Sequence, residues 1–363
     1  MNITIIGAGN AGCAHAFEFS GIGHEVTLVK TSHSLHEDNY EAIRENGGIY
    51  CVDDTEHKER SFRKIHKITR DIADGLENAD LVIIMTQSSQ HLRVAELVCN
   101  ELPESVRMIL ILPGNLGSLI FRKYLKNVNI ILAEGESTIY DARIIEPGVV
   151  NIICKNHRNA LAFLPVSGKI KGMEMAGKLS GTYSYTRRNI IESAFNNPNI
   201  VSHTIGVIVS ASRIEMAKGE FWMYRESFSP SVWNLVRDLD KERNDVIEAF
   251  KGERISYLDA GKFRHEKDLS RDSYEVFLSY AAAGAPKGPA SLDTRYLYED
   301  VGIGLCLLSL FGRKFNIPTP VTDALITIAS SLVNSDLRAN AWTFDDLGLS
   351  GMSNEEIISY INS

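Results

Sequence analysis

The stretch NITIIGAGNAGCAHAFEFSGIGHEVTLVK, residues 2–30, decides the expected fold. Its first part, residues 2–6, is a short and mainly apolar run, which is typical of a buried parallel strand. A glycine-rich turn follows, and an alanine-rich helical segment then leads to a second apolar run at residues 25–29. This order predicts strand, helix and strand in one compact unit of the Rossmann type.

The glycines of this turn, Gly7, Gly9 and Gly12, have the spacing G-x-G-x-x-G. In such a unit the first allows the tight turn, the second lets the backbone approach a pyrophosphate, and the third lets helix and strand pack closely. The helix N-terminus adds free N–H groups and a positive dipole end. Together with Asn10 and Ala11, these glycines predict a dinucleotide site. The alternative is a glycine turn without a ligand.

The residues after the second strand bear on the choice of cofactor. An NAD-binding unit usually has Asp or Glu there, to accept a hydrogen bond from the ribose 2′-OH. This chain has Lys30, Thr31 and Ser32 instead, and a lysine with two hydroxyls suits a 2′-phosphate. The sequence therefore predicts NADP(H). NAD(H) is the alternative, because Glu37 or Asp38 could fold back, and Lys30 could also be an ordinary solvated lysine.

Two more apolar runs, within residues 79–90 and 107–118, end in polar turns. Parallel strands of an open α/β sheet bind ligands in the crevice at their carboxyl ends. The residues expected to contact nicotinamide or substrate there are Gln87, Ser88, Pro113 and Asn115. Each could instead serve only the geometry of its turn.

The remaining segments predict one sheet followed by helices. Strands that extend the sheet are expected at 129–138, 149–156 and 159–165. Helices are expected at 168–179, 199–217, 229–250, 272–283, 293–315 and 319–334, with a loop at 284–293. The fold class is therefore α/β followed by all-α. A Rossmann-type nucleotide-binding domain covers residues 1–180 and a helical substrate domain covers 181–363, which is an oxidoreductase architecture.

Composition excludes several other classes. The chain has 363 residues, of which 44% are hydrophobic, and a formal net charge of −8 with no basic block. Nucleic acid and anionic membranes are therefore not expected as partners. The five cysteines are scattered without metal-ligand spacing, so no metal site is expected. With no apolar run of membrane-spanning length and a strand beginning at residue 2, a cytoplasmic protein without a signal peptide is expected.

The segment NNPNIVSHTIGVIVSASRIE, residues 196–215, places a histidine in an apolar helix. Helical spacing puts the following residues on one stripe: His203, Gly206, Ser210, Arg213 and Ala217. Small and polar residues at this spacing indicate that a backbone or a ligand comes close. A histidine there can transfer protons near neutral pH, although from these residues alone a core histidine is the leading interpretation.

A second candidate is SLDTRYLYEDVGIGLCLLSLFG, residues 291–312. Asp300 falls on a helix face that is otherwise apolar, and a buried carboxylate must be paired. Arg295 and Glu299 can pair with each other at i, i+4, so Asp300 needs another partner. A histidine elsewhere in the chain is the natural one, and a His–Asp pair is a recurrent acid/base device in hydride transfer.

Seven blocks of the sequence resemble, in order, the octopine/nopaline (opine) dehydrogenase family. They are IGAGNAG, EAIRENGGI, ILPGNLG, AEGESTIYDAR, EPGVVNI, NPNIVSHTIGVIVSASRIE and TRYLYEDVGIGL, and together they extend over nearly the whole chain. The resemblance implies reductive condensation of an amino acid with a 2-oxo acid such as pyruvate, using NAD(P)H.

The resemblance also implies roles for individual residues. His203 and Asp300 match the family's catalytic pair, and Arg295 matches the arginine that holds a substrate carboxylate. Ser137 stands where the family commonly has threonine near the 2-oxo acid, and Glu134 of the same block is a further substrate-binding candidate. The chain departs from the family at Ile139 and directly after the histidine, where proline is frequent, and this concerns the amino-acid pocket.

Two other functions remain open from the sequence. One is a carbonyl reductase of the ketopantoate reductase or 3-hydroxyacid type, which would rely on a lysine such as Lys218 or Lys287. The other is a non-catalytic NADP-binding sensor, which needs the glycine turn alone. Segments 228–250 and 253–275 are expected to line the amino-acid pocket, whose specificity the sequence does not identify. It also allows a homodimer.

Overall fold

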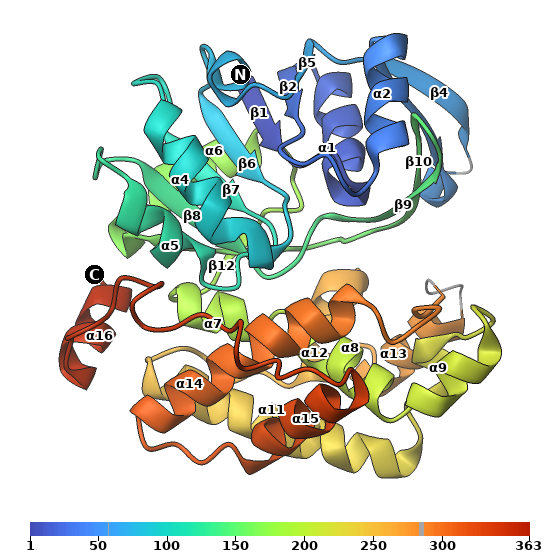
Figure 1. The fold of residues 1–363 in the computed structure, drawn as a ribbon, viewed down its shortest axis with the longest axis vertical. Coiled ribbons are helices and arrows are strands. Elements are labelled where there is room, and N and C mark those ends of the chain that lie inside the picture. Colours follow the sequence, from blue (N-terminus) through green and yellow to red (C-terminus); the bar gives the residue numbers. More distant parts are fainter. Residues whose placement is uncertain (57, 283–286) are drawn as a thin grey trace. The chain divides into compact units, whose positions relative to one another are not determined.

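The computed structural model describes residues 1–56, 58–282 and 287–363 (Figure 1). The chain divides into two compact units, Met1–Thr186 and Arg187–Ser363. The sequence places the boundary earlier, at 180/181, and the difference arises because strand β12 (Tyr185–Thr186) pairs with β11 (Ala160–Leu164) in the first unit. Of the expected loop at 284–293, residues 284–286 lie outside the described residues, and the remainder contains no helix or strand.

An eight-stranded sheet in the order β12-β11-β8-β7-β6-β1-β2-β5 forms the centre of the first unit. Its other strands are β1 (Asn2–Ile6), β2 (Glu25–Val29), β5 (Lys67–Thr69), β6 (Leu81–Ile84), β7 (Met108–Ile111) and β8 (Ile131–Gly135). All neighbouring pairs are parallel except β11 and β8. The glycine turn therefore follows a central strand, and β1, β6 and β7 end at the same edge of the sheet.

A second sheet, in the order β4-β3-β10-β9, corrects one expectation. Its strands are β3 (Gly48–Asp53), β4 (Lys58–Lys64), β9 (Tyr140–Glu146) and β10 (Val149–Lys155). The expectation that 149–156 extends the main sheet is wrong. This segment pairs with β3 and, through the turn at Gly148, with β9. Hydrophobic pattern identifies a strand, but it does not identify the strand's partners.

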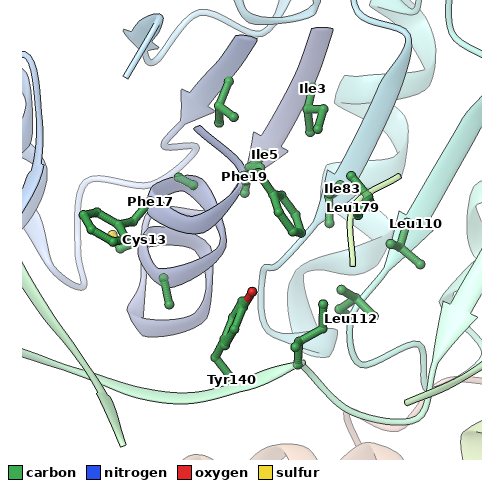
Figure 2. Packing of buried hydrophobic residues seen from close by; sticks show 14 of the residues in the cluster. Ile3, Ile5, Cys13, Phe17, Phe19, Ile83, Leu110, Leu112, Tyr140 and Leu179 are labelled. Atoms are coloured by element: carbon green, nitrogen blue, oxygen red, sulfur yellow. The ribbon is translucent and has the colours of Figure 1, made fainter. Parts of the chain in front are cut away.

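Helices accompany both sheets in this unit. They are α1 (Asn10–Gly21), α2 (Glu37–Asn46), α3 (Ile72–Leu76), α4 (His91–Glu101), α5 (Gly117–Tyr124) and α6 (Lys169–Gly177), with short 3₁₀ turns at Asp54–Glu56, Ser88–Gln90 and Val166–Gly168. Figure 2 shows Phe19 of α1 beside Ile5, Ile83 and Leu110 of the three central strands, and all four side chains are fully buried. Burying each such side chain contributes about 1.5–3 kcal/mol, which fixes α1 against the sheet.

The described residues of the second unit contain helices and no strand. The helices are α7 (Ile190–Phe195), α8 (Asn199–Ile208), α9 (Ala211–Ala217), α10 (Met223–Glu226), α11 (Pro230–Ala249), α12 (Tyr257–His265), α13 (Ser273–Ala282), a π-helix (Tyr296–Leu305), α14 (Cys306–Lys314), α15 (Pro320–Leu332) and α16 (Asn354–Ile361). No helix among the described residues combines the length and hydropathy that crossing a membrane requires.

Two expected helices are broken in the structure. The segment 199–217 consists of α8 and α9, which are separated at Val209 and Ser210, so His203 and Arg213 do not share one continuous stripe. The hydroxyl of Ser210, at this break, bonds to that of Ser227 at 2.8 Å. The segment 293–315 begins as a π-helix, and its side chains therefore follow a wider turn than the α-helical spacing assumed from the sequence.

Candidate active site

Two of the three glycines of the first turn, Gly7 and Gly12, meet steric demands, and Gly9 is open. Gly7 has a φ of +124°, and a Cβ there would lie 2.7 Å from the Met85 carbonyl oxygen. A Cβ on Gly12 would lie 1.8 Å from the Gly7 oxygen, so this glycine lets α1 pack against the turn. A Cβ on Gly9 would find no atom nearer than 3.8 Å. This open position at the start of α1 is the one where the sequence predicts a pyrophosphate.

The side chain of Asn10 has a partner within the unit. Its Oδ1 accepts a hydrogen bond of 2.8 Å from the backbone N–H of Ile144 in β9. The Ala11 carbonyl oxygen is 2.8 Å from Nδ1 of His15, one turn further along the helix. Ligand contacts at the start of α1 are therefore expected from backbone N–H groups, while the Asn10 side chain ties the helix to the second sheet.

Lys30 is buried at the end of β2. The alternative of a solvated lysine is wrong, since the residue is only 4% exposed. Its Nζ donates to the Leu35 carbonyl at 2.7 Å and the Ser32 hydroxyl at 3.2 Å, and it lies 3.6 Å from the Glu37 carboxylate. Burial lowers the pKa of Lys30, and the Glu37 carboxylate acts in the opposite direction. Thr31, between these residues, accepts a bond of 3.3 Å from Arg93 through its carbonyl.

Arg70 is a second cation at this edge that the sequence analysis missed. It follows β5, which pairs in parallel with β2, and its guanidinium donates to the Ser32 carbonyl at 2.9 Å. It also bonds to the Glu37 carboxylate and lies 4.2 Å from the centroid of the Tyr40 ring. The three-residue strand that positions Arg70 has no long apolar run, and a search for cations after every short strand would have been needed to find it.

The loops after β6 and β7 are joined by side chains. Asn115 Nδ2 donates to the Ser88 hydroxyl at 2.8 Å, so these two candidates meet. Pro113 opens the second loop, and Asn115 and Leu116 both have positive φ, at 49° and 64°. Gln87 lies half-buried directly before Ser88. The candidates Gln87, Ser88, Pro113 and Asn115 therefore lie in two loops that a hydrogen bond connects.

The Glu134 side chain, in β8, binds the backbone of the loop that follows β7. The residue is fully buried, and its carboxylate accepts backbone N–H bonds from Leu116 at 3.1 Å and Ser118 at 2.8 Å. Burial raises the pKa of Glu134 to about 7, against the opposing effect of these hydrogen bonds. The structure thus buries the carboxylate of this substrate-binding candidate against the loop backbone that carries Asn115.

Stability should respond to the titration of Glu134. Because its folded pKa of about 7 is above the ordinary 4.5, its contribution is fully present below pH 4.5 and is lost as pH rises through 7. This corresponds to about 3 kcal/mol over that interval. Urea unfolding from pH 4 to 8 should show a flatter profile for Glu134→Gln than for wild type. Glu101→Gln, at an exposed position, is the control, and parallel wild-type and Glu134→Gln profiles would contradict this assignment.

Ser137, in the loop after β8, contacts the side chains of two asparagines. Its hydroxyl lies 3.4 Å from both Asn156 Nδ2 and Asn159 Oδ1, and Asn159 also donates to the Ser137 carbonyl at 2.6 Å. The side chain is half-buried. This network fixes the hydroxyl that the family resemblance associates with the 2-oxo acid.

In the second unit, the structure brings His203 and Asp300 together. His203 Nδ1 lies 2.8 Å from Asp300 Oδ2, and the two side chains are 8% and 2% exposed. Since the carboxylate accepts, Nδ1 carries a proton, and in the neutral imidazole Nε2 then has the lone pair. A buried imidazole oriented in this way can accept and return a proton, and the carboxylate stabilises the charged form.

Arg295 lies at the start of the π-helix that carries Asp300. Its guanidinium donates to the Glu299 carboxylate at 3.0 Å, as the i, i+4 spacing predicts. Glu299 is nearly buried at 4% exposure, whereas the Arg295 side chain is 45% exposed. Glu299 therefore orients a guanidinium that still presents part of its surface, and that surface suits a planar carboxylate.

The π-helix approaches α8 closely at one glycine. A Cβ on Gly304 would lie 2.5 Å from Cγ2 of Ile200, one turn before His203. The Ile200 side chain is β-branched and fully buried, so it has little freedom to move away. The absence of a side chain at Gly304 therefore sets the spacing that lets His203 reach Asp300.

Gly304→Ala should separate these two helices. Overpacking of this kind costs about 1–3 kcal/mol, and turnover should fall because the His203–Asp300 bond is stretched. Gly261→Ala is the matched control, since a Cβ at that helical glycine meets nothing within 4 Å. Denaturant unfolding and steady-state kinetics measure both variants, and a Gly304→Ala protein as stable and active as Gly261→Ala would refute the close-contact argument.

The Rossmann sheet with its glycine turn and the buried His–Asp pair define the class, an NAD(P)-dependent oxidoreductase. Residues 186–333 match the family model described as NAD/NADP octopine/nopaline dehydrogenase, alpha-helical domain. Residues 3–152 match the model of ketopantoate reductase PanE/ApbA. The described residues contain no cluster of three His, Cys, Asp or Glu side chains suited to a metal ion.

Individual proteins agree with these matches. The opine dehydrogenase of Arthrobacter sp. (strain 1C) is 30% identical over 290 residues, which cover 79% of this chain and 80% of the relative. The structure of octopine dehydrogenase with NADH and L-arginine superposes with a TM-score of 0.76 at 15% identity, covering 99% of this chain and 98% of the other. For NADP⁺-bound yersinopine dehydrogenase the TM-score is 0.69 at 13% identity, with 100% and 98% covered.

The chain belongs to the opine dehydrogenase family. It is an NAD(P)-dependent oxidoreductase that acts on CH–NH bonds. The resemblance inferred from the sequence and the predicted fold class, a Rossmann domain followed by a helical domain, are both confirmed.

Proposed function

We propose that this enzyme condenses the amine of an amino acid with a 2-oxo acid such as pyruvate and reduces the product to an N-(carboxyalkyl)amino acid. The observation that carries this proposal is the buried bond between His203 and Asp300, within the domain that matches the octopine/nopaline dehydrogenase model. Related octopine dehydrogenase structures hold NADH with L-arginine, agmatine or pyruvate, which supports this substrate class.

His203 moves the protons in this scheme. It removes a proton from the substrate ammonium, so that the free amine attacks the 2-oxo carbon, and it returns a proton to the hydroxyl that leaves as water. The Asp300 carboxylate keeps Nδ1 protonated and stabilises the imidazolium between these transfers. A bound reduced nicotinamide supplies the hydride that converts the resulting imine to the secondary amine.

Arg295 orients the 2-oxo acid in this proposal. The half-exposed Arg295 guanidinium holds the substrate carboxylate through two parallel N–H bonds, with Glu299 fixing its position. Ser137, whose hydroxyl lies 3.4 Å from Asn156 and Asn159, is the substrate-binding candidate of the Rossmann domain. The helical domain thereby supplies the acid/base pair and the carboxylate clamp, and the Rossmann domain supplies the nucleotide site.

His203→Ala should lower kcat by at least about 100-fold, because general acid/base groups contribute typically 10²–10⁴. The dissociation constant of NADPH, measured by fluorescence titration, should stay within about twofold, since no nucleotide contact is assigned to this residue. His66→Ala, at an exposed position of the first domain, is the control. A His203→Ala enzyme with near wild-type turnover would exclude His203 as the acid/base.

The second candidate function is carbonyl reduction, and the ketopantoate reductase match over residues 3–152 favours it. Oxidation of NADPH is followed with a panel of 2-oxo acids, each with and without amino acids. Amine-dependent oxidation supports the opine reaction, whereas amine-independent oxidation supports a carbonyl reductase. Binding of NADPH without oxidation by any pair would support a non-catalytic sensor.

We propose that NADP(H) is the preferred cofactor. Two cations converge on Ser32 at the end of β2, where a 2′-phosphate would lie: Lys30 donates to its hydroxyl and Arg70 to its carbonyl. The Glu37 carboxylate forms ion pairs with both of them, which partly neutralises the acidic group that an NAD-type ribose contact would need. NADP⁺-bound yersinopine dehydrogenase shows that this fold accommodates that cofactor.

Arg70→Ala should raise the KM for NADPH roughly tenfold or more while changing the KM for NADH little, since a hydrogen bond to a charged group contributes about 1.5–3 kcal/mol. Glu37→Gln should shift selectivity toward NADPH, because it removes the carboxylate that neutralises both cations. Arg44→Ala is the control, because Arg44 pairs with Glu41 and is more exposed than Arg70. Equal changes in both KM values after Arg70→Ala would argue against a 2′-phosphate contact.

A cytoplasmic location and a homodimer complete the proposal. The five cysteines are all unpaired in the structure, as in proteins of a reducing compartment. Size-exclusion chromatography with light scattering tests the dimer directly.

A further inference from the structure

Tyr296 stacks on the imidazole of His203. The ring centroids are 3.6 Å apart and the ring planes differ by 10°. Tyr296 is the first residue of the π-helix, and Asp300, which bonds to Nδ1 of the same imidazole, lies four residues further along it. The π-helix thus contacts the His203 imidazole in two ways. Asp300 binds the edge of the ring, and Tyr296 covers one of its faces.

These two contacts restrain different motions. The bond from Nδ1 to Asp300 acts within the ring plane and limits rotation of the imidazole in that plane. The Tyr296 ring acts perpendicular to the plane and limits its tilt. Proton transfer needs the acceptor lone pair directed at the proton within hydrogen-bond reach, and this direction depends on both restraints.

The geometry of the stack fits a charged imidazole better than a neutral one. Neutral aromatic pairs prefer offset or edge-to-face arrangements over a close parallel sandwich. A cation, in contrast, is attracted to the negative face of a tyrosine ring within about 6 Å of its centroid. At 3.6 Å and nearly parallel, the Tyr296 face is placed to stabilise the imidazolium that forms when His203 takes up a proton.

We propose that Tyr296 is a positioning residue for His203, whose ring face holds the imidazole plane and supports its protonated form during turnover. This inference rests on the proposed acid/base role of His203. It assigns the function to the aromatic face of Tyr296, so phenylalanine should replace it and leucine should not.

The stack can be measured without substrate. A tyrosine face 3.6 Å away shifts the imidazole ¹H resonances upfield through its ring current. In enzyme with ¹³C-labelled histidine, the His203 signal is assigned among the ten histidines by its loss in His203→Ala. The upfield shift should persist in Tyr296→Phe and disappear in Tyr296→Leu. Tyr298→Leu, which removes a tyrosine that is 43% exposed on the same helix, is the matched control and should leave it unchanged.

The same variants then test the consequence for catalysis. Tyr296→Leu should lower kcat roughly three- to tenfold, as expected for loss of an aromatic pair, with the KM for the nicotinamide cofactor unchanged. Tyr296→Phe and Tyr298→Leu should stay within about twofold of wild type, and thermal unfolding identifies any variant that fails to fold.

Three results would overturn the proposal. The first is an unchanged His203 resonance in Tyr296→Leu, and the second is loss of the upfield shift in that variant with full turnover. The third is an equal loss of turnover in Tyr296→Phe and Tyr296→Leu, which would assign the effect to the hydroxyl. Wild-type enzyme without amine-dependent turnover would overturn the proposed function, and this inference with it. Failure of the Tyr296 variants alone, in an active enzyme, would leave the proposed function standing.

Discussion

The helical domain is organised around one hydrogen bond, between Asp300 and His203. The Asp300 carboxylate is almost fully removed from water, so it has to meet a donor. The bond to His203 joins residues 97 positions apart and connects α8 to the π-helix. Removing either partner would leave the other buried and unsatisfied, which is among the more costly single changes in a protein interior. Because Gly304 lets the two helices approach, the packing of this domain and the acid/base chemistry proposed for it depend on the same contact.

Local backbone geometry explains why the glycine turn and its flanking elements were predictable. The strand, turn and first helix follow one another directly, and Gly7 and Gly12 answer steric demands set by near neighbours, such as the carbonyl of Met85 beside Gly7. Pairing between distant strands is different. The segment 149–155 alternates as any strand does, and only the packed structure assigns it to β3 and β9. Arg70 was missed for the same reason, since its position depends on β5 lying beside β2.

The helical domain shows a similar division. The need of Asp300 for a partner followed from the charge pattern, and the family resemblance pointed to His203 as well. The stacking of Tyr296 on that histidine did not follow, because the π-helix places its side chains at a wider spacing than the α-helical one assumed from the sequence. The break between α8 and α9 at Val209 and Ser210 was not predicted either, since no Pro or Gly marks it in the sequence.

The hydrogen bond between Asn10 and Ile144 has a consequence for how this sequence can vary. The donor is the backbone N–H of Ile144, so nearly any side chain at that position preserves the bond, and proline alone removes the donor. Asn10, in contrast, contributes its side-chain oxygen and has few replacements of equal reach. Among homologues the two ends of one bond should therefore diverge at very different rates. Position 10 should stay nearly constant, whereas position 144 should drift freely, although both take part in the bond that ties the start of α1 to β9.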